Sequence, residues 1–167
     1  MNEFVDPTLF TPVVFLTNSL TAVYMHNYLY SILFLNLFCT SLLCRLHVSE
    51  STYLIDIVAI YLTVVYGAYL YILHFMHFSA VSHGVILSTF LFTVFFHHYG
   101  YITKEYSYNK DIYVAKQYNS LVHIISSLGH HMIILSQTGL WETLLPYDDV
   151  LLARPYIHES DFHPSCR

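Results

Sequence analysis

Positively charged residues are scarce in this sequence. Between Arg45 and Lys104 the chain runs for fifty-eight residues without a lysine or an arginine, and only 10% of its 167 residues are charged. A water-soluble domain carries charge at about a quarter of its positions, so this composition excludes an ordinary soluble protein. The six basic residues form neither a patch nor a tail, which excludes nucleic acid as a partner. An integral membrane protein is therefore expected.

The motifs of common soluble enzymes are also missing. The five glycines are isolated, so there is no glycine-rich phosphate-binding loop, and neither a nucleophile elbow nor an HExxH zinc motif occurs. The three cysteines, Cys39, Cys44 and Cys166, lack the CxxC spacing of a zinc or redox site. Cys39 and Cys44 lie inside an apolar segment, where cysteine behaves as a small apolar side chain.

Long apolar segments predict the fold. A membrane-spanning helix needs about 20 mainly apolar residues, and the candidate spans are 9–25, 28–45, 53–73, 79–97 and 112–136. The stretch 53–97 would be about 67 Å long as a single helix, so it must break near residues 74–79 or protrude from the membrane. The sequence thus predicts an all-α, multi-span transmembrane bundle of about five helices over residues 1–139. An extended polar tail that docks on partner subunits is expected over residues 140–167.

The few basic residues predict the orientation. Arg45 ends the second predicted span, whereas Lys104, Lys110 and Lys116 lie in or beside the loop that precedes the last one. With five spans, both groups fall on the same side of the membrane as the amino terminus. Positive charge is retained on the cytosolic or matrix side, so that side is predicted for the amino terminus too.

Polar side chains within the apolar segments indicate where the helices face one another. We expect the asparagines Asn18, Asn27 and Asn36, together with Ser41, Asp56 and the histidines, to turn inward rather than toward lipid. Arg45 and Glu50 flank the loop between the second and third spans, and we interpret them as interface charges or a surface pair.

Ser41, Asp56 and His123 form one candidate site, because they lie on three different predicted spans. An ionisable residue inside a membrane is costly to bury, so Asp56 is a functional candidate. In the alternative interpretation, Asp56 lies within about one turn of the membrane interface and only hydrogen-bonds a serine or tyrosine. Most of the twelve histidines lie at span ends, and only His123 lies mid-span. A haem site would need His83 opposite His123, and no haem or other metal cofactor is expected.

Four collinear segments resemble the carboxy-terminal part of cytochrome c oxidase subunit III. HGVILSTFLFTVF at 83–95 is similar to HVIIGSTFL of that family, YNSLVHII at 118–125 to YWHFVDVV, LHVSE at 46–50 to LQASE, and MHNYL at 25–29 to AHHSL. The resemblance implies a non-catalytic subunit of a respiratory-chain complex, complex IV in the first place, in the mitochondrial inner membrane. It implies contacts with other membrane subunits and structural phospholipid, made by His26, Glu50 and His83, and no haem or copper in this chain.

A second resemblance is to the membrane superfamily of alkaline ceramidases, adiponectin and progestin receptors and myomaker. The separation of Ser41 and Asp56 fits the serine and aspartate of that superfamily, and NSLVHIISSLG at 119–129 is similar to its HSLWHLLSALG. The resemblance implies an intramembrane zinc hydrolase or receptor whose zinc is held by three histidines. The matching positions here are Arg45, Asn119 and His123. This alternative is therefore a degenerate member with Ser41, Asp56 and His123 at its polar site.

Overall fold

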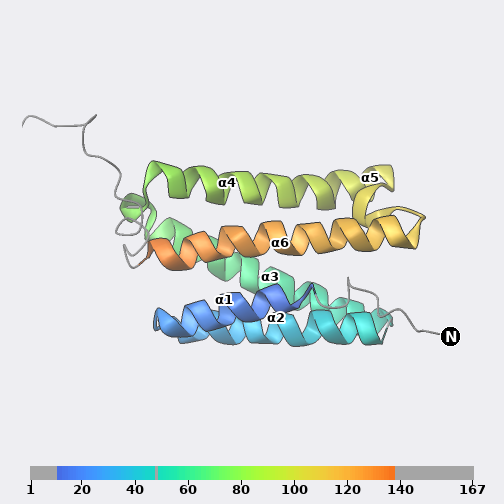
Figure 1. The fold of residues 1–167 in the computed structure, drawn as a ribbon, viewed down its shortest axis with the longest axis horizontal. Helices are drawn as coiled ribbons and strands as arrows, with labels where there is room; N and C mark the ends of the chain where they lie inside the picture. Colours follow the sequence, from blue (N-terminus) through green and yellow to red (C-terminus); the bar gives the residue numbers. More distant parts are fainter. Residues whose placement is uncertain (1–10, 48, 138–167) are drawn as a thin grey trace, which may run out of the picture.

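The computed structural model describes residues 11–47 and 49–137, which form antiparallel helices joined by short turns (Figure 1). The five long helices of this part are α1 (Val13–Tyr24), α2 (Tyr28–Leu46), α3 (Glu50–Leu73), α4 (Ala80–Val94) and α6 (Ile112–Ser136). After α4 the chain continues through a π-helical stretch, Phe95–Tyr99, into the short helix α5 (Gly100–Thr103). The predicted all-α bundle of about five helices is confirmed. The predicted tail at 140–167, with its docking on partner subunits, lies outside the described residues.

The long apolar stretch breaks where the sequence predicts. Helix α3 ends at Leu73, a single 3-10 turn follows at Phe75–His77, and α4 begins at Ala80. Ser79 caps the new helix, because its Oγ accepts a hydrogen bond of 3.2 Å from the backbone N–H of Ser82. The capping hydroxyl supplies a partner for an N–H group that the first turn of a helix leaves unpaired, which fixes the start of α4.

Three helical segments of the described chain are long and apolar enough to cross a membrane: Tyr28–Leu46, Glu50–Leu73 and Ala80–Tyr108. Helix α1 is apolar, but its 12 residues span only about 18 Å, less than the hydrocarbon core of about 30 Å. Helix α6 has 25 residues but includes three histidines and four serines. The structure thus supports a transmembrane helical protein with three apolar spans, rather than five.

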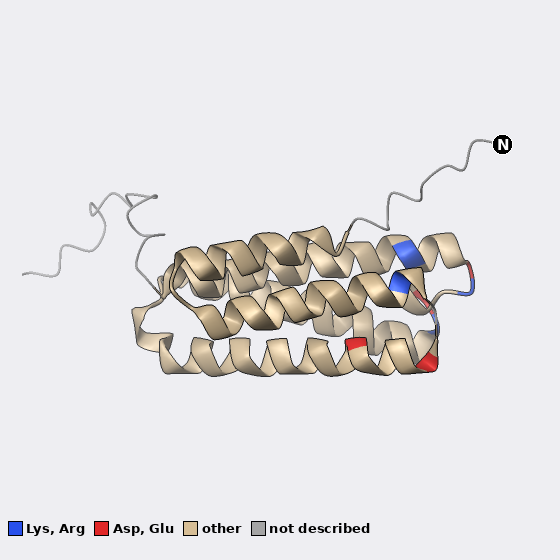
Figure 2. Ribbon diagram, turned by 90° about the horizontal axis from the view of Figure 1, so that it is seen from below, with Lys and Arg blue, Asp and Glu red and all other residues tan. Residues whose placement is uncertain are grey.

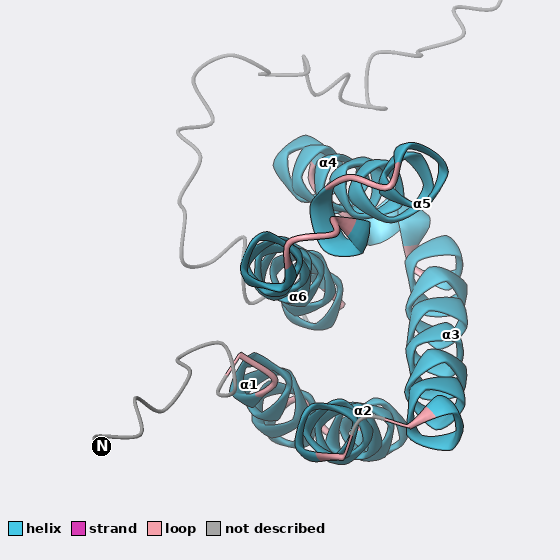
Figure 3. Cartoon of the chain, turned by 90° about the vertical axis from the view of Figure 1, so that its right-hand side faces the viewer, coloured by secondary structure: helices cyan, strands magenta, loops and turns pink. Residues whose placement is uncertain are grey.

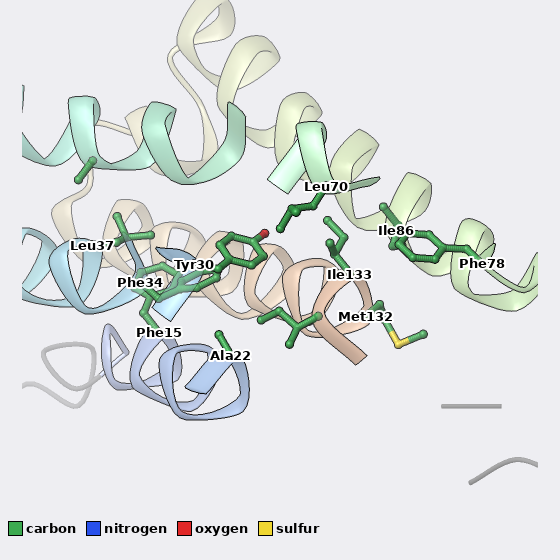
Figure 4. Close-up of a cluster of buried hydrophobic side chains, with 12 residues drawn as sticks. Phe15, Ala22, Tyr30, Phe34, Leu37, Leu70, Phe78, Ile86, Met132 and Ile133 are labelled. Carbon is green, nitrogen blue, oxygen red and sulfur yellow. The ribbon is translucent and has the colours of Figure 1, made fainter. Parts of the chain in front are cut away.

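The helices are arranged around α6 and α2. Seen along the bundle, α6 lies between α1 and α4, while α2 lies between α1 and α3 (Figure 3). The buried apolar side chains come from all five long helices, and Figure 4 shows Tyr30 and Phe34 at their centre, with ring centroids 4.8 Å apart. Contact between α6 and α1 places the last described helix against the first.

Polar and apolar side chains are distributed as a membrane protein requires. Asn18 and Thr63 are completely buried, whereas Leu20 and Leu91 are about two-thirds exposed, at 69% and 65%. Apolar side chains can face lipid without cost, but polar groups there would lose their hydrogen bonds. The prediction of inward polar groups is confirmed for Asn18 and wrong for Asn36, which is exposed.

All the charged residues of the described chain lie toward one end of the bundle (Figure 2). Arg45 and Glu50 lie at the junction of α2 and α3, and the others lie on α3, α6 and the loop that follows α5. Arg45 and the three lysines share one end of the bundle, whereas their common side of a membrane stays a prediction. We call this end the charged end. The opposite end, with the α1–α2 and α3–α4 turns, has no charged residue in the described part.

Candidate functional site

Ser41 and Asp56 meet between α2 and α3. Ser41 Oγ donates a hydrogen bond of 2.6 Å to Asp56 Oδ1, and Thr40 Oγ1 donates one of 2.9 Å to the same oxygen. Ser49 is the N-cap residue of α3. The short connection before it makes the last turns of α2 and the first turns of α3 neighbours. Ser41 is buried and Asp56 is partly exposed. The carboxylate therefore has two hydroxyl donors, as a half-buried acceptor requires.

Arg45 and His123 form the second half of the same site. Arg45 Nη2 lies 3.4 Å from His123 Nδ1. A guanidinium only donates hydrogen bonds, so Nδ1 is the acceptor and the ring proton of His123 is on Nε2. His123 is buried, and the ring of Phe15 lies 5.0 Å away, centroid to centroid. The contact ties the end of α2 to the middle of α6.

The four residues Ser41, Arg45, Asp56 and His123 constitute what we call the polar site. Arg45 follows Ser41 by one helical turn, so the two side chains leave α2 on the same face. Ser41 and Asp56 are in direct contact, whereas His123 contacts Arg45, one helical turn from Ser41. Asp56 hydrogen-bonds a serine, as the alternative interpretation expected.

Arg45 contacts His123 rather than forming only a surface pair with Glu50; its place at the membrane interface stays a prediction. Its side chain extends inward to His123, whereas Glu50 is exposed at the first residue of α3. The signal for an inward Arg45 is its spacing of four residues from Ser41, which places both residues on one helix face.

Glu50 does not share a cleft with His26 and His83 within this chain. His26 lies in the α1–α2 turn, where its Nδ1 is 3.1 Å from the hydroxyl of Tyr28. Glu50 lies at the opposite end of the bundle, because α2 with its 19 residues separates the two positions by about 28 Å. His83 lies in the first turns of α4, with its Nδ1 2.8 Å from the hydroxyl of Tyr71. Any contacts of Glu50 with lipid or partners are therefore made at the opposite end from those of the two histidines.

A second buried cluster lies nearer the uncharged end. The hydroxyl of Tyr30 hydrogen-bonds His130 Nδ1, and Gly67 of α3 lies directly against both side chains. The adjacent hydroxyl of Tyr66 donates to Asn27 Oδ1 at 3.4 Å. This Tyr30–His130 cluster holds α2, α3 and α6 together. It was not predicted as a site, although His130 follows His123 by seven residues and thus returns to nearly the same face of α6.

A third polar contact joins α1 to α6. Ser127 Oγ donates a hydrogen bond of 2.9 Å to Asn18 Oδ1, and Asn18 Nδ2 lies 3.4 Å from the carbonyl oxygen of Ser127. Hydrogen bonds of this kind hold helices together where lipid removes the hydrophobic driving force between them. This contact has a structural role and needs no ligand.

The residues of the polar site do not fit a zinc ion. A catalytic zinc site uses three protein ligands, and no group of three or more histidine, cysteine or acidic side chains with that geometry occurs in the described chain. His123 and Asp56 supply two suitable side chains. The third position is Arg45, whose permanent positive charge repels a metal cation and whose nitrogens offer no lone pair.

No protein family, curated protein or solved structure matches this chain. The two resemblances therefore rest on the sequence segments that carry them.

Proposed function

We propose that the protein is a non-catalytic, receptor-like membrane protein, a degenerate relative of the alkaline ceramidase, adiponectin receptor and myomaker superfamily. The observation that carries the proposal is the hydrogen bond of 2.6 Å between Ser41 and Asp56, with His123 joined to the same group through Arg45. The second resemblance expects a serine, an aspartate and a histidine at a single polar site. These residues come from α2, α3 and α6 and meet toward the charged end of the bundle.

The absence of hydrolytic activity is proposed from the chemistry of Arg45. Zinc hydrolases of this kind need a metal to activate water and to polarise the scissile carbonyl group. A guanidinium can hold an anion, but it cannot lower the pKa of a bound water as zinc does. The site therefore retains polar residues of the superfamily without its metal chemistry.

An assay of amide and ester hydrolysis tests this proposal. The purified protein, supplied with zinc in detergent micelles, is incubated with fluorescent ceramide and with a fluorescent fatty-acyl ester. We expect no release of fatty acid above that of the matched His123→Ala variant. Zinc-dependent turnover that is lost in both Ser41→Ala and His123→Ala would show that the protein is an enzyme and would overturn the proposal.

The second candidate function is a non-catalytic subunit of a respiratory-chain complex in the mitochondrial inner membrane. One structural feature supports it: an open apolar groove on α4 and α6, lined by Gly84, Ser88, Thr89, Phe92, Ile125 and Leu128 among others. Much of this groove belongs to the segment 83–95 that resembles subunit III. Small residues on a helix surface let a second helix approach closely, so the groove fits a helix of a neighbouring subunit.

Native electrophoresis with mass spectrometry of co-migrating proteins separates the two candidates. Migration with haem-bearing subunits supports the respiratory role, and we then expect Gly84→Leu to weaken that association. Truncation at Gly139 is expected to leave the bundle inserted but to reduce its incorporation into the complex. A full-length protein that migrates alone, or a truncated chain that assembles at the normal level, contradicts the respiratory role.

A further inference from the structure

We propose that the turn between α3 and α4 binds Cu(I), a soft monovalent metal ion, through the imidazoles of His74 and His77, with the thioether of Met76 as a third ligand. We call these three residues the turn site. The inference goes beyond the proposed function and does not rest on it. The turn site lies at the uncharged end of the bundle, whereas the polar site lies toward the charged end (Figure 2).

The backbone of the turn brings the two histidines together. His74 follows the last residue of α3, and the backbone N–H of His77 donates a hydrogen bond of 2.9 Å to the carbonyl oxygen of His74. This is the hydrogen bond of a 3-10 turn, in which side chains three residues apart lie one above the other. The centroids of the two imidazole rings are accordingly 6.3 Å apart.

That separation suits one shared ion. A metal lies about 2 Å from an imidazole nitrogen that binds it, so two rings on opposite sides of one ion have centres about 6 Å apart. Rotation about the Cβ–Cγ bond turns a ring nitrogen toward the ion and leaves the ring centre nearly in place. Neither imidazole is engaged in a hydrogen bond with another described residue, so the nitrogens of both are available as ligands.

Two phenylalanines hold the other side of the turn against the helices. Phe78 is buried, and the ring centroid of Phe75 lies 4.5 Å from that of His83 and 5.6 Å from that of Tyr71. His83 is not a further ligand, since its Nδ1 lies 2.8 Å from the hydroxyl of Tyr71. The aromatic side of the turn therefore packs on α3 and α4, and the histidine side remains open.

The ligands determine which metal the turn site prefers. Two neutral imidazoles and a thioether carry no negative charge, and the described chain has no charged residue at this end to balance a dication. Thioether sulfur favours Cu(I), whereas Mg²⁺ and Ca²⁺ prefer oxygen ligands. A structural or catalytic zinc site needs at least three histidine, cysteine or acidic ligands, and the described residues supply no such group.

The position of the turn makes the site accessible from water. The turn joins Glu50–Leu73 to Ala80–Tyr108, two segments long and apolar enough to cross a membrane, and a turn between two spans lies at a membrane surface. His77 is exposed, and Met76 is 89% exposed. The unbranched side chain of methionine has three rotatable bonds, so the sulfur of Met76 can approach an ion held by the histidines.

A competition for Cu(I) tests the inference. The full-length chain with its three cysteines replaced by serine, which removes competing thiols, is purified in detergent. It is titrated without oxygen, in the presence of ascorbate, into the coloured Cu(I) complex of bicinchoninate. We expect this parent chain to withdraw one Cu(I) from the dye, and the double variant His74→Ala with His77→Ala to withdraw none. His98→Ala is the matched control, because His98 is an exposed histidine outside the turn, and it should bind as the parent does.

Single substitutions assign the ligands. His74→Ala and His77→Ala should each weaken Cu(I) binding by about tenfold or more, since even an outer-shell partner of a metal ligand contributes that much. Met76→Leu, which keeps the size of the side chain and removes the sulfur, should also weaken binding. Unchanged binding by Met76→Leu would overturn the assignment of Met76. No binding by the parent, or equal binding by the parent and the double variant, would overturn the inference.

Thermal unfolding in detergent shows whether the variants fold and whether the ion stabilises this turn. Ag(I) replaces Cu(I) here, because it has the same charge and similar softness and is not oxidised by air. We expect Ag(I) to raise the midpoint of the parent and not that of the double variant, since a ligand that binds only the folded state stabilises it. If the double variant does not fold, His77→Ala decides, because its side chain is exposed, and an unchanged affinity for Cu(I) would overturn the inference. The hydrolysis assay tests the proposed function separately, so the two failures are distinguishable.

Discussion

Ser41 and Asp56 are separated by 15 residues in the sequence, yet Ser41 Oγ lies 2.6 Å from Asp56 Oδ1. This hydrogen bond joins α2 to α3 near the loop that connects them. It therefore fixes the relative position of two of the three apolar spans, as well as the carboxylate of the polar site.

Replacing Ser41 with alanine measures how much this hydrogen bond contributes to the stability of the fold. Asp56 would keep only Thr40 as a hydroxyl donor, and loss of a donor to a partly buried charged group costs about 1–3 kcal/mol. We expect Ser41→Ala to lower the free energy of unfolding by that amount, measured by denaturant titration in micelles. Ser88→Ala is the matched control, because Ser88 is exposed on α4. Equal stability of the two variants would contradict the assigned role of Ser41.

Replacing Asp56 with asparagine separates its charge from its capacity to accept hydrogen bonds. The amide oxygen can still accept from Ser41 and Thr40, but the charge that balances Arg45 is lost. We expect an intermediate loss of stability with no change in bound metal, and a larger loss for Asp56→Leu, which leaves both hydroxyl groups without their acceptor. The measurements are the thermal unfolding midpoint and the zinc content of the same samples. If Asp56→Asn lowers the unfolding midpoint as much as Asp56→Leu does, only the charge of Asp56 contributes to stability.

The two glycines Gly67 and Gly84 offer a matched pair of substitutions. A Cβ at Gly67 would lie 3.0 Å from two ring atoms of His130 and would also meet the hydroxyl of Tyr30, whereas a Cβ at Gly84 would meet nothing within 4 Å. We expect Gly67→Ala to lower the unfolding midpoint because α3 must move away from the Tyr30–His130 cluster. Gly84→Ala should leave the midpoint unchanged or raise it slightly, since alanine favours a helix over glycine. The opposite order would contradict the close approach of α3 to α6.

The distribution of charge predicts the membrane topology. In a chain whose three cysteines are replaced by serine, Lys110→Cys and His77→Cys place single thiols at the charged and uncharged ends. We expect a membrane-impermeant thiol reagent to label them from opposite compartments, because the apolar segment Ala80–Tyr108 lies between the two positions and positive charge is retained on one side of the membrane. Labelling of both from the same side would mean that Ala80–Tyr108 does not cross the membrane.

Much of the fold follows from the sequence, for identifiable reasons. The break between α3 and α4 was predictable because an unbroken helix would be far longer than a bilayer is thick. The meeting of Ser41 with Asp56 was predictable because both interrupt apolar segments and need partners.

Other features could not be predicted from the sequence. Asn36 was expected to face inward, but α2 is apolar on most of its surface, so its hydrophobic pattern does not identify the inner face. The direction of Arg45 depends on rotatable bonds in a long side chain near a helix end, where extension outward and extension inward are both sterically allowed. To predict the Tyr30–His130 cluster, one would need to know how α3 crosses α6. That crossing depends on packing between segments far apart in the sequence.

Zinc content tests the central claim most directly, namely that the polar site is complete without a metal. The wild-type protein, extracted in detergent from cells grown with added zinc, is compared with His123→Ala and Asp56→Asn by elemental mass spectrometry. We expect the same background level in all three proteins, because Arg45 lies against His123 Nδ1 and the described residues supply no third metal ligand at this site. Stoichiometric zinc in the wild type that disappears in His123→Ala or Asp56→Asn would contradict this account.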